Sequence, residues 1–281
     1  MRRDTALYGL GAIALSGCGA LRERARVIAH GCVDAAAPSM SGVRVLRGRI
    51  PTRHVATAVR YAVLVPVDAR RLDAVAYLLP GRSVDPDGEL AIGLGGFYAA
   101  YLRGGSAPFA LAIMDSGESY YHPRPAGENR LAVATVDFPR VVRELLGTAQ
   151  LREALLGESM GGYGALLAAE REPQRYRAVA VAGPAIFPSY ADERGSVGDA
   201  FDSASDFARY DVIAQASALR GRPVRIWCGL HDPFLPGVRA FARACPTADV
   251  HVQAGCHDDG SWRASAPWRF EFVGRHLSRS A

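Results

Sequence analysis

The feature that most limits how this chain can fold is the pentapeptide Gly157-Glu158-Ser159-Met160-Gly161, which has the form G-x-S-x-G. Residues 151–156 (LREALL) before it suit a buried strand, and residues 162–169 (GYGALLAA) after it suit a helix. A serine on a sharp strand-to-helix turn presents its hydroxyl to a base, and flanking glycines leave room for backbone brought close by the turn. The pentapeptide therefore predicts that Ser159 is a nucleophile.

Apolar runs and helical patterns alternate along most of the chain. We expect β segments at residues 43–50 and 57–65, followed by buried strands at 75–79, 109–114, 151–156, 178–182, 224–228 and 250–254. Helical patterns cover residues 89–102, 129–146 with a break or kink at Pro139, 236–244 and 262–277. This order predicts one α/β domain over residues 43–281, with a mostly parallel sheet and helices on both faces.

Residues 183–220 are the exception to the alternation, because they place several short helical patches between two strands. They form either part of a lid or pocket wall, or a plain surface excursion.

Two further side chains complete a candidate catalytic set with Ser159. Ligands of parallel sheets bind beyond the carboxyl ends of the strands. Asp232 follows the strand at 224–228, and His257 follows the strand at 250–254. A serine hydroxyl needs a base and a group that orients the base, in the chain order Ser, Asp, His. We therefore expect His257 to act as general base and then acid, and Asp232 to fix the imidazole tautomer.

Other residues could fill the same roles. His231 is an alternative base, although it precedes a further strand and so comes out of order. Asp232 could be a mere turn residue before Pro233. The alternative acids are Asp211, Asp258 and Asp259.

The negative charge that develops on a reacting ester carbonyl requires two N–H donors. One should be the backbone of Met160, after the nucleophile, and the other that of Arg82, in the loop Pro80-Gly81-Arg82-Ser83 after a strand. Tyr120, Tyr121 and His122 lie in another loop on the same side of the sheet. They either line a substrate pocket or only pack that loop.

The chain resembles the esterase branch of the α/β hydrolases, which includes the esterase D-like enzymes and the antigen 85 mycolyltransferases. The resemblance covers roughly residues 57–277 and rests on VAYLLPG, MDSGESYYHPRPAG, LLGESMGGYGALLAAE, WCGLHDPF and GCHDDGSW. It implies an α/β-hydrolase fold and a serine hydrolase or acyltransferase that acts on esters without a cofactor. It also implies that Ser159, Asp232 and His257 form the triad, although antigen 85 proteins use a Glu as the acid.

Three functions remain open from the sequence. The first is a carboxylic ester hydrolase that works through an acyl-enzyme on Ser159, with a small-molecule or lipid ester as substrate. The second is an acyltransferase of the same fold, which an added alcohol acceptor would reveal. The third is a catalytically inactive surface-binding protein, against which the complete triad argues.

Charge and composition exclude some partners. All 33 basic residues are Arg, and the net charge of +5 is spread along the chain without a run of five like charges, which disfavours nucleic acid as a partner. The spacing of the cysteines does not suggest a metal site.

The first 18 residues have the pattern of an export signal. Arg2 and Arg3 precede the apolar run 6–15, which is too short to span a membrane. Residues 15–18 (LSGC) resemble a bacterial lipobox, which predicts lipidation of Cys18 and a cell-envelope lipoprotein. A plain signal peptide, cut nearby to give a secreted protein, is the alternative. Residues 19–42 are then expected to be a tether or irregular segment.

Four cysteines follow the signal, at positions 32, 228, 245 and 256. An exported chain can form disulfides, and four cysteines allow three pairings. Because Cys228 ends one expected strand and Cys256 follows another, we consider a Cys228–Cys256 pair, with two buried thiols as the alternative.

Overall fold

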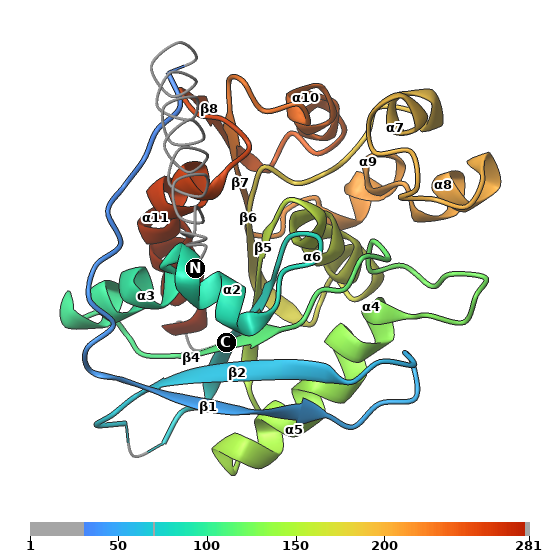
Figure 1. Cartoon of the computed structure of the whole chain (residues 1–281). Helices are drawn as coiled ribbons and strands as arrows, with labels where there is room; N and C mark the ends of the chain where they lie inside the picture. Colours follow the sequence, from blue (N-terminus) through green and yellow to red (C-terminus); the bar gives the residue numbers. More distant parts are fainter. Residues whose placement is uncertain (1–30, 70, 279–281) are drawn as a thin grey trace, which may run out of the picture.

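The computed structural model describes residues 31–69 and 71–278 (Figure 1). Its centre is an eight-stranded sheet in the order β1-β2-β4-β3-β5-β6-β7-β8. The strands are β1 (Val43–Ile50), β2 (Val59–Pro66), β3 (Ala74–Leu79), β4 (Ala110–Met114), β5 (Arg152–Glu158), β6 (Tyr176–Ala182), β7 (Val224–Gly229) and β8 (Asp249–Gln253). Strand β2 is antiparallel to β1 and β4, and the remaining neighbours are parallel. The predicted α/β-hydrolase fold is confirmed by this mostly parallel sheet and its helices.

Two hydrophobic cores lie on the two faces of the sheet, because successive strand side chains point to opposite sides. In β3, Val75, Tyr77 and Leu79 belong to one core, and Ala76 and Leu78 to the other. The first core is covered by α5 (Phe138–Leu146), α6 (Met160–Arg171) and α10 (Leu235–Ala244). The second is covered by α3 (Leu94–Arg103) and α11 (Asp259–Ser278), which pack together on the other face (Figure 1).

The helices differ from the expected ones in two places. The pattern at 89–102 is divided into α2 (Pro86–Ile92) and α3 by Gly93, whose φ of 108° ends the first helix in a left-handed conformation. The pattern at 129–146 contains α4 (Arg130–Ala132), a π-helical turn η1 (Val133–Asp137) and then α5. The backbone stays right-handed helical where η1 joins α5, so the irregularity before Pro139 is a π-helical turn inside one helical stretch.

Residues 183–220 form several short helices, as the sequence indicates. These are α7 (Tyr190–Ser196), α8 (Ala204–Tyr210), α9 (Val212–Gln215) and the 3-10 turn η2 (Ala216–Leu219). Ser189, Ser203 and Asp211 cap α7, α8 and α9 by accepting hydrogen bonds from backbone N–H groups. Because α9 contacts α6 and α10, this excursion is packed onto the same face as the first core.

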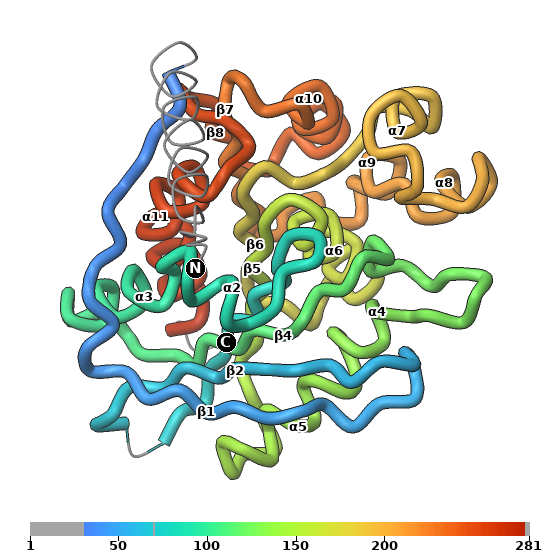
Figure 2. The backbone as a smooth tube through the Cα atoms, in the orientation of Figure 1, coloured from blue at the N-terminus to red at the C-terminus, as the bar shows by residue number. Residues whose placement is uncertain are grey.

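Residues 32–41 form an extended segment, here called the N-terminal strap. It contains no helix or strand, and Figure 2 shows it running from the start of α11 past α3 to β1. A disulfide joins Cys32 to Cys256 at its beginning. The Pro38 carbonyl lies so close to Gly96 that a Cβ there would be 1.9 Å from its oxygen. The strap is thus packed against the domain. The boundary expected at residue 42 stays a prediction.

The considered pairing of Cys228 with Cys256 is wrong. Cys228 is a buried free thiol, as is Cys245. Along β7, Trp227 packs against Trp262 of α11, whereas Cys228 belongs to the core under α6 and α10. The alternation of side chains therefore points Cys228 away from the face on which the strap brings Cys32 to Cys256.

Replacement of Gly161 tests the close packing of α6 against the sheet. A Cβ at Gly161 would lie 1.8 Å from the Leu79 carbonyl oxygen. We expect Gly161→Ala to lower the free energy of unfolding by at least about 1–3 kcal/mol, measured by urea denaturation. The control is Gly195→Ala in α7, where a Cβ meets nothing within 4 Å. That change should be neutral or stabilise by less than about 1 kcal/mol. Equal effects of the two changes would contradict this account.

Candidate active site

Ser159 stands on a strained turn between β5 and α6. Its φ of 53° and ψ of −121° lie outside the regions that a non-glycine residue ordinarily occupies. Neighbouring backbone holds it there, because Ser159 N donates to the Ala182 carbonyl at 3.1 Å and Ser159 O accepts from Ala185 N at 2.8 Å. Gly157 and Gly161 are in contact, and a Cβ on Gly157 would lie 2.3 Å from the Gly161 carbonyl oxygen. The sequence therefore permits a turn that larger residues at these positions would block.

The structure brings Ser159, His257 and Asp232 into one hydrogen-bonded chain. His257 Nε2 lies 2.8 Å from Ser159 Oγ, and His257 Nδ1 lies 2.9 Å from Asp232 Oδ2. The Asp232 side chain is fully buried, and its Oδ1 accepts a hydrogen bond from Phe234 N at 2.8 Å. Since a carboxylate only accepts, Nδ1 is the donor and a neutral ring leaves Nε2 free to accept the serine proton.

The alternative residues lie in other places. His231 is on the exposed turn after β7, and its N donates to the Gly255 carbonyl. Asp211 caps α9, Asp258 Oδ1 accepts from Ser261 N, and Asp259 lies in the first turn of α11. Asp232 is thus the carboxylate that contacts the His257 ring.

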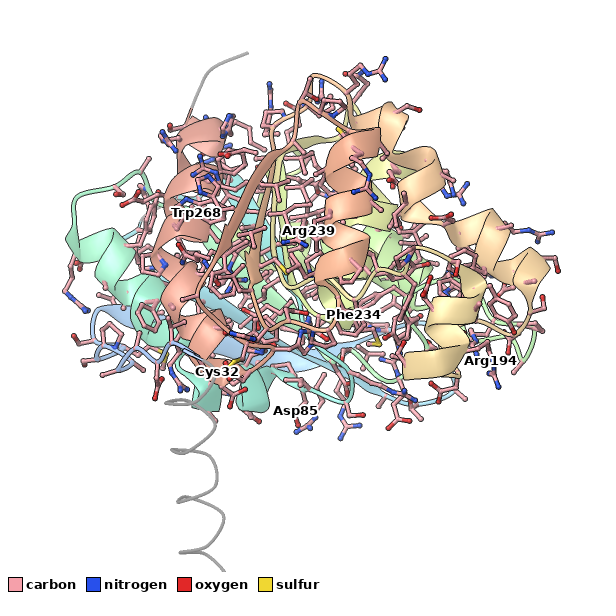
Figure 3. All side chains as sticks on the ribbon, turned by 90° about the horizontal axis from the view of Figure 1, so that it is seen from above. Cys32, Asp85, Arg194, Phe234, Arg239 and Trp268 are labelled. Atoms are coloured by element: carbon pink, nitrogen blue, oxygen red, sulfur yellow. A yellow bond between two sulfur atoms is a disulfide. The ribbon has the colours of Figure 1, made fainter. Side chains whose placement is uncertain are left out.

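Two aromatic rings fix the plane of the His257 imidazole. The centroids of Phe234 and Trp262 lie 4.9 and 4.8 Å from that of His257, both in edge-to-face geometry. Figure 3 shows Phe234 at the start of α10 and Cys32 beside the start of α11. Sequence reasoning missed these two aromatic residues, although both lie within five residues of a predicted catalytic residue in the chain.

The predicted oxyanion donors flank Ser159. Met160 is the first residue of α6. The loop that carries Arg82 comes close on the other side, because a Cβ on Gly81 would lie 3.6 Å from Ser159 Cβ. Ser83 N donates to the Gly117 carbonyl at 2.9 Å and fixes the end of this loop.

The Arg82 side chain is paired. Its two terminal nitrogens donate to the two Asp199 carboxylate oxygens at 2.8 and 2.7 Å. This pairing raises the pKa of Arg82 and lowers that of Asp199. It connects the expected oxyanion loop to residues 183–220.

Tyr120, Tyr121 and His122 are all buried. A Cβ on Gly164 of α6 would meet the Tyr121 ring, which therefore packs on that helix. The His122 ring is stacked between Phe201 and Tyr210, and burial lowers its pKa. The contacts show these residues as packing groups, and the pocket-lining role stays a prediction.

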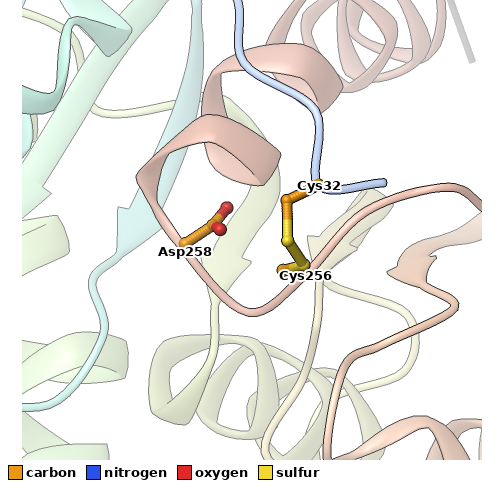
Figure 4. Close-up of side chains that lie close together, drawn as sticks. All are labelled: Cys32, Cys256 and Asp258. Atoms are coloured by element: carbon orange, nitrogen blue, oxygen red, sulfur yellow. A yellow bond between two sulfur atoms is a disulfide. The ribbon is translucent and has the colours of Figure 1, made fainter. Parts of the chain in front are cut away.

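Two clusters in the described part of the chain have metal-ligand side chains within 4.8 Å of one another. In the cluster of His122, Asp202 and Asp206, Arg124 already pairs with Asp202 at 2.9 Å. In the cluster of Cys32, Cys256 and Asp258, the two sulfurs are bonded to each other (Figure 4). Neither set offers three available donors.

A buried acidic pair below the turn was also missed by the sequence reasoning. Glu158, next to Ser159, forms an ion pair with Arg269 at 2.5 Å, and Arg269 also donates to the Trp262 carbonyl at 3.1 Å. Glu89 is fully buried, and neither of its carboxylate oxygens has a hydrogen-bond partner among the described residues. Burial and the charge of Glu158 hold the pKa of Glu89 well above its usual value.

This geometry belongs to the α/β-hydrolase class: a serine on a strand-to-helix turn, with an Asp and a His from two later loops. Residues 103–278 match the model of the family described as "Putative esterase", which is more than half of the chain. The protein belongs to this family and is a carboxylic ester hydrolase.

Solved structures support the fold. A ferulic acid esterase is 18% identical with a TM-score of 0.71, over 84% of this chain and 99% of its own. An S-formylglutathione hydrolase from Agrobacterium tumefaciens is 16% identical with a TM-score of 0.70, over 88% and 100%. MPT51 from Mycobacterium tuberculosis is 16% identical with a TM-score of 0.67, over 84% and 99%. The resemblance to the esterase D and antigen 85 branch is confirmed.

The raised pKa of Glu89 makes the free energy of unfolding depend on pH in a defined direction. Because its folded-state pKa is raised above the usual 4.5, its contribution is fully present below pH 4.5 and is lost as the pH rises. We expect Glu89→Gln, which cannot ionise, to gain stability relative to the wild type as the pH rises above 4.5. Urea unfolding at a series of pH values measures this difference. Parallel profiles for the two proteins would rule the interpretation out.

Proposed function

We propose that this protein hydrolyses carboxylic esters through an acyl-enzyme on Ser159, with His257 as base and Asp232 as the residue that orients it. The observation that carries the proposal is the continuous hydrogen-bonded chain Ser159–His257–Asp232, with distances of 2.8 and 2.9 Å. The three groups follow β5, β7 and β8, so this alignment requires these strands to be folded together.

In the first half of the reaction, His257 Nε2 accepts the Ser159 proton while Oγ bonds to the ester carbonyl carbon. The carbonyl oxygen becomes negative and accepts hydrogen bonds from the backbone N–H groups of Met160 and Arg82. The C–O bond to the alcohol then breaks, and the imidazolium gives its proton to the departing alcohol. Buried Asp232 stabilises the imidazolium between these two transfers.

In the second half, water replaces the alcohol. His257 takes one proton from water, the hydroxide attacks the acyl-enzyme carbonyl, and the bond to Ser159 Oγ breaks as His257 returns the proton to it. The products are a carboxylic acid and the free enzyme. The protein's own groups supply every proton transfer, so the reaction as proposed needs no cofactor.

Removal of the nucleophile tests the assignment. We expect Ser159→Ala to fold normally and to reduce kcat on p-nitrophenyl esters by roughly 10⁴–10⁶-fold, because the members of such a triad act as a unit. A series of esters of increasing acyl length, assayed by p-nitrophenol release, measures both this loss and the acyl preference.

His231→Ala is the matched control, since it removes the other histidine near the site without touching the relay. It should keep kcat within about threefold of the wild type, a free-energy difference below about 1 kcal/mol. Loss of activity in His231→Ala but not in Ser159→Ala would contradict the assigned roles.

We also propose that the protein is exported and held at the cell envelope by lipid on Cys18. The first 30 residues lie outside the described part of the structure, so this proposal rests on the signal-like sequence. The Cys32–Cys256 disulfide supports it, because such bonds persist in oxidising compartments. None of the described helices is both long and apolar enough to cross a bilayer.

Substitution of Cys18 tests the anchor. Cys18→Ala should move the protein from the membrane fraction to the soluble fraction, measured by fractionation and immunoblotting, because the acylated residue is lost. Cys245→Ser, which changes a buried thiol far along the chain, should leave the distribution unchanged. A membrane-bound Cys18→Ala protein would exclude the lipoprotein proposal.

A further inference from the structure

The disulfide lies directly beside the proposed catalytic histidine. Cys256 is bonded to Cys32 and immediately precedes His257 in the chain (Figure 4). The two cysteines are 224 residues apart, their Cα atoms are 5.1 Å apart, and both are buried. The disulfide thus fixes the residue next to the proposed general base.

The loop that carries His257 is short and packed on its inner side. It connects β8, which ends at Gln253, to α11, which begins at Asp259. Gly255 has a φ of 154°, and its carbonyl lies so close to Gly229 that a Cβ there would be 2.3 Å from the oxygen. Cys256 N donates to Ser261 Oγ at 3.0 Å. These contacts hold the loop against β7 and the start of α11.

The N-terminal strap is fixed to the first turns of α11, which directly follow this loop. The Val33 carbonyl packs on Gly260, where a Cβ would lie 2.2 Å from its oxygen. Asp34 accepts hydrogen bonds from Arg263 Nε and a terminal nitrogen at 3.0 and 2.6 Å. Arg263 also donates to the Ile92 carbonyl at 3.3 Å. The strap is therefore anchored to α11 and to the end of α2. Through the disulfide, Cys256 is bonded to this anchored segment.

We propose that the Cys32–Cys256 disulfide is a positioning element for His257, so that catalysis is fully competent only when the strap is covalently joined to the histidine loop. The proposal rests on the proposed function of His257. General base catalysis requires Nε2 within hydrogen-bond reach of Oγ, and a displacement of about 1 Å can cost about 100-fold in rate. Oxidation of the two cysteines then restricts the position of His257, which is held less firmly in the reduced protein.

The redox step is a thiol–disulfide exchange. In activation, the thiols of Cys32 and Cys256 lose two electrons and two protons to a disulfide oxidant, which becomes a dithiol, as their S–S bond forms. In reduction by dithiothreitol, the reagent's two thiols form a cyclic disulfide while the two cysteines regain their protons. A chain that has not left a reducing compartment would therefore carry an incompletely ordered site.

The experiment compares oxidised and reduced wild type with Cys32→Ser, at a temperature where circular dichroism shows all three to be folded. We expect reduction and Cys32→Ser each to lower kcat by about tenfold with KM within about twofold, as expected when transition-state geometry is lost. Reoxidation should restore the wild type and leave Cys32→Ser unchanged. EDTA is included, because the freed thiols lie within 4.8 Å of an Asp258 oxygen and together could capture zinc.

A second readout does not depend on turnover. In protein labelled with ¹⁵N-histidine, the His257 Nδ1 proton that is donated to Asp232 should give a sharp NMR signal in the oxidised form. We expect this signal to broaden or shift on reduction. If the oxidised enzyme has no turnover while the signal still responds, the proposed function fails and the positioning role stands.

Two control variants separate the disulfide from its surroundings. Cys245→Ser removes a free thiol and should respond to reduction as the wild type does. Asp34→Asn weakens the strap's ion pair with the disulfide intact, and it should lower kcat less than Cys32→Ser.

An unchanged kcat and an unchanged His257 signal in folded, reduced protein would overturn the proposal. A loss of kcat that only follows the unfolded fraction would do so too, because it would make the disulfide a general stabiliser.

Discussion

The hydrogen bond between His257 Nδ1 and buried Asp232 is the interaction on which the site depends, because it determines which imidazole nitrogen faces Ser159. A buried carboxylate requires donors, and Asp232 finds them in the His257 ring and in Phe234 N. Edge contacts from Phe234 and Trp262 then fix the ring plane. The loops that follow β7 and β8 thus supply both of the hydrogen-bond donors that this carboxylate accepts from.

Much of this arrangement can be predicted from sequence, because it follows from periodicity and chain order. Buried strands such as β3 and β4 are uninterrupted apolar runs, and parallel strands bring the residues after their carboxyl ends to one edge. This rule, together with the chain order Ser, Asp, His, predicts Asp232 and His257 as partners of Ser159. The catalytic roles themselves are chemical proposals that the geometry supports.

What could not be predicted depends on contacts between distant segments. No local pattern indicates that Cys32 crosses the fold to meet Cys256, or that Glu89 is buried near Glu158 and Arg269. The strap has no periodicity, so its path is determined by glycines that admit its backbone, such as Gly96 and Gly260. Tyr120 and Tyr121 adopt φ values of 54° and 57°, and nothing in the sequence around them predicts this left-handed conformation.

The path of the strap also determines how the molecule can be presented to its surroundings. Cys32, near the beginning of the described residues, is fixed beside the His257 loop, at the edge of the sheet that carries the proposed triad. Thirteen residues separate Cys32 from Cys18, a reach of at most about 50 Å when fully extended. An attachment at Cys18 would tether the domain within this reach of the surface that bears it, through a point beside the His257 loop. Esters in that surface would then be met at high local concentration.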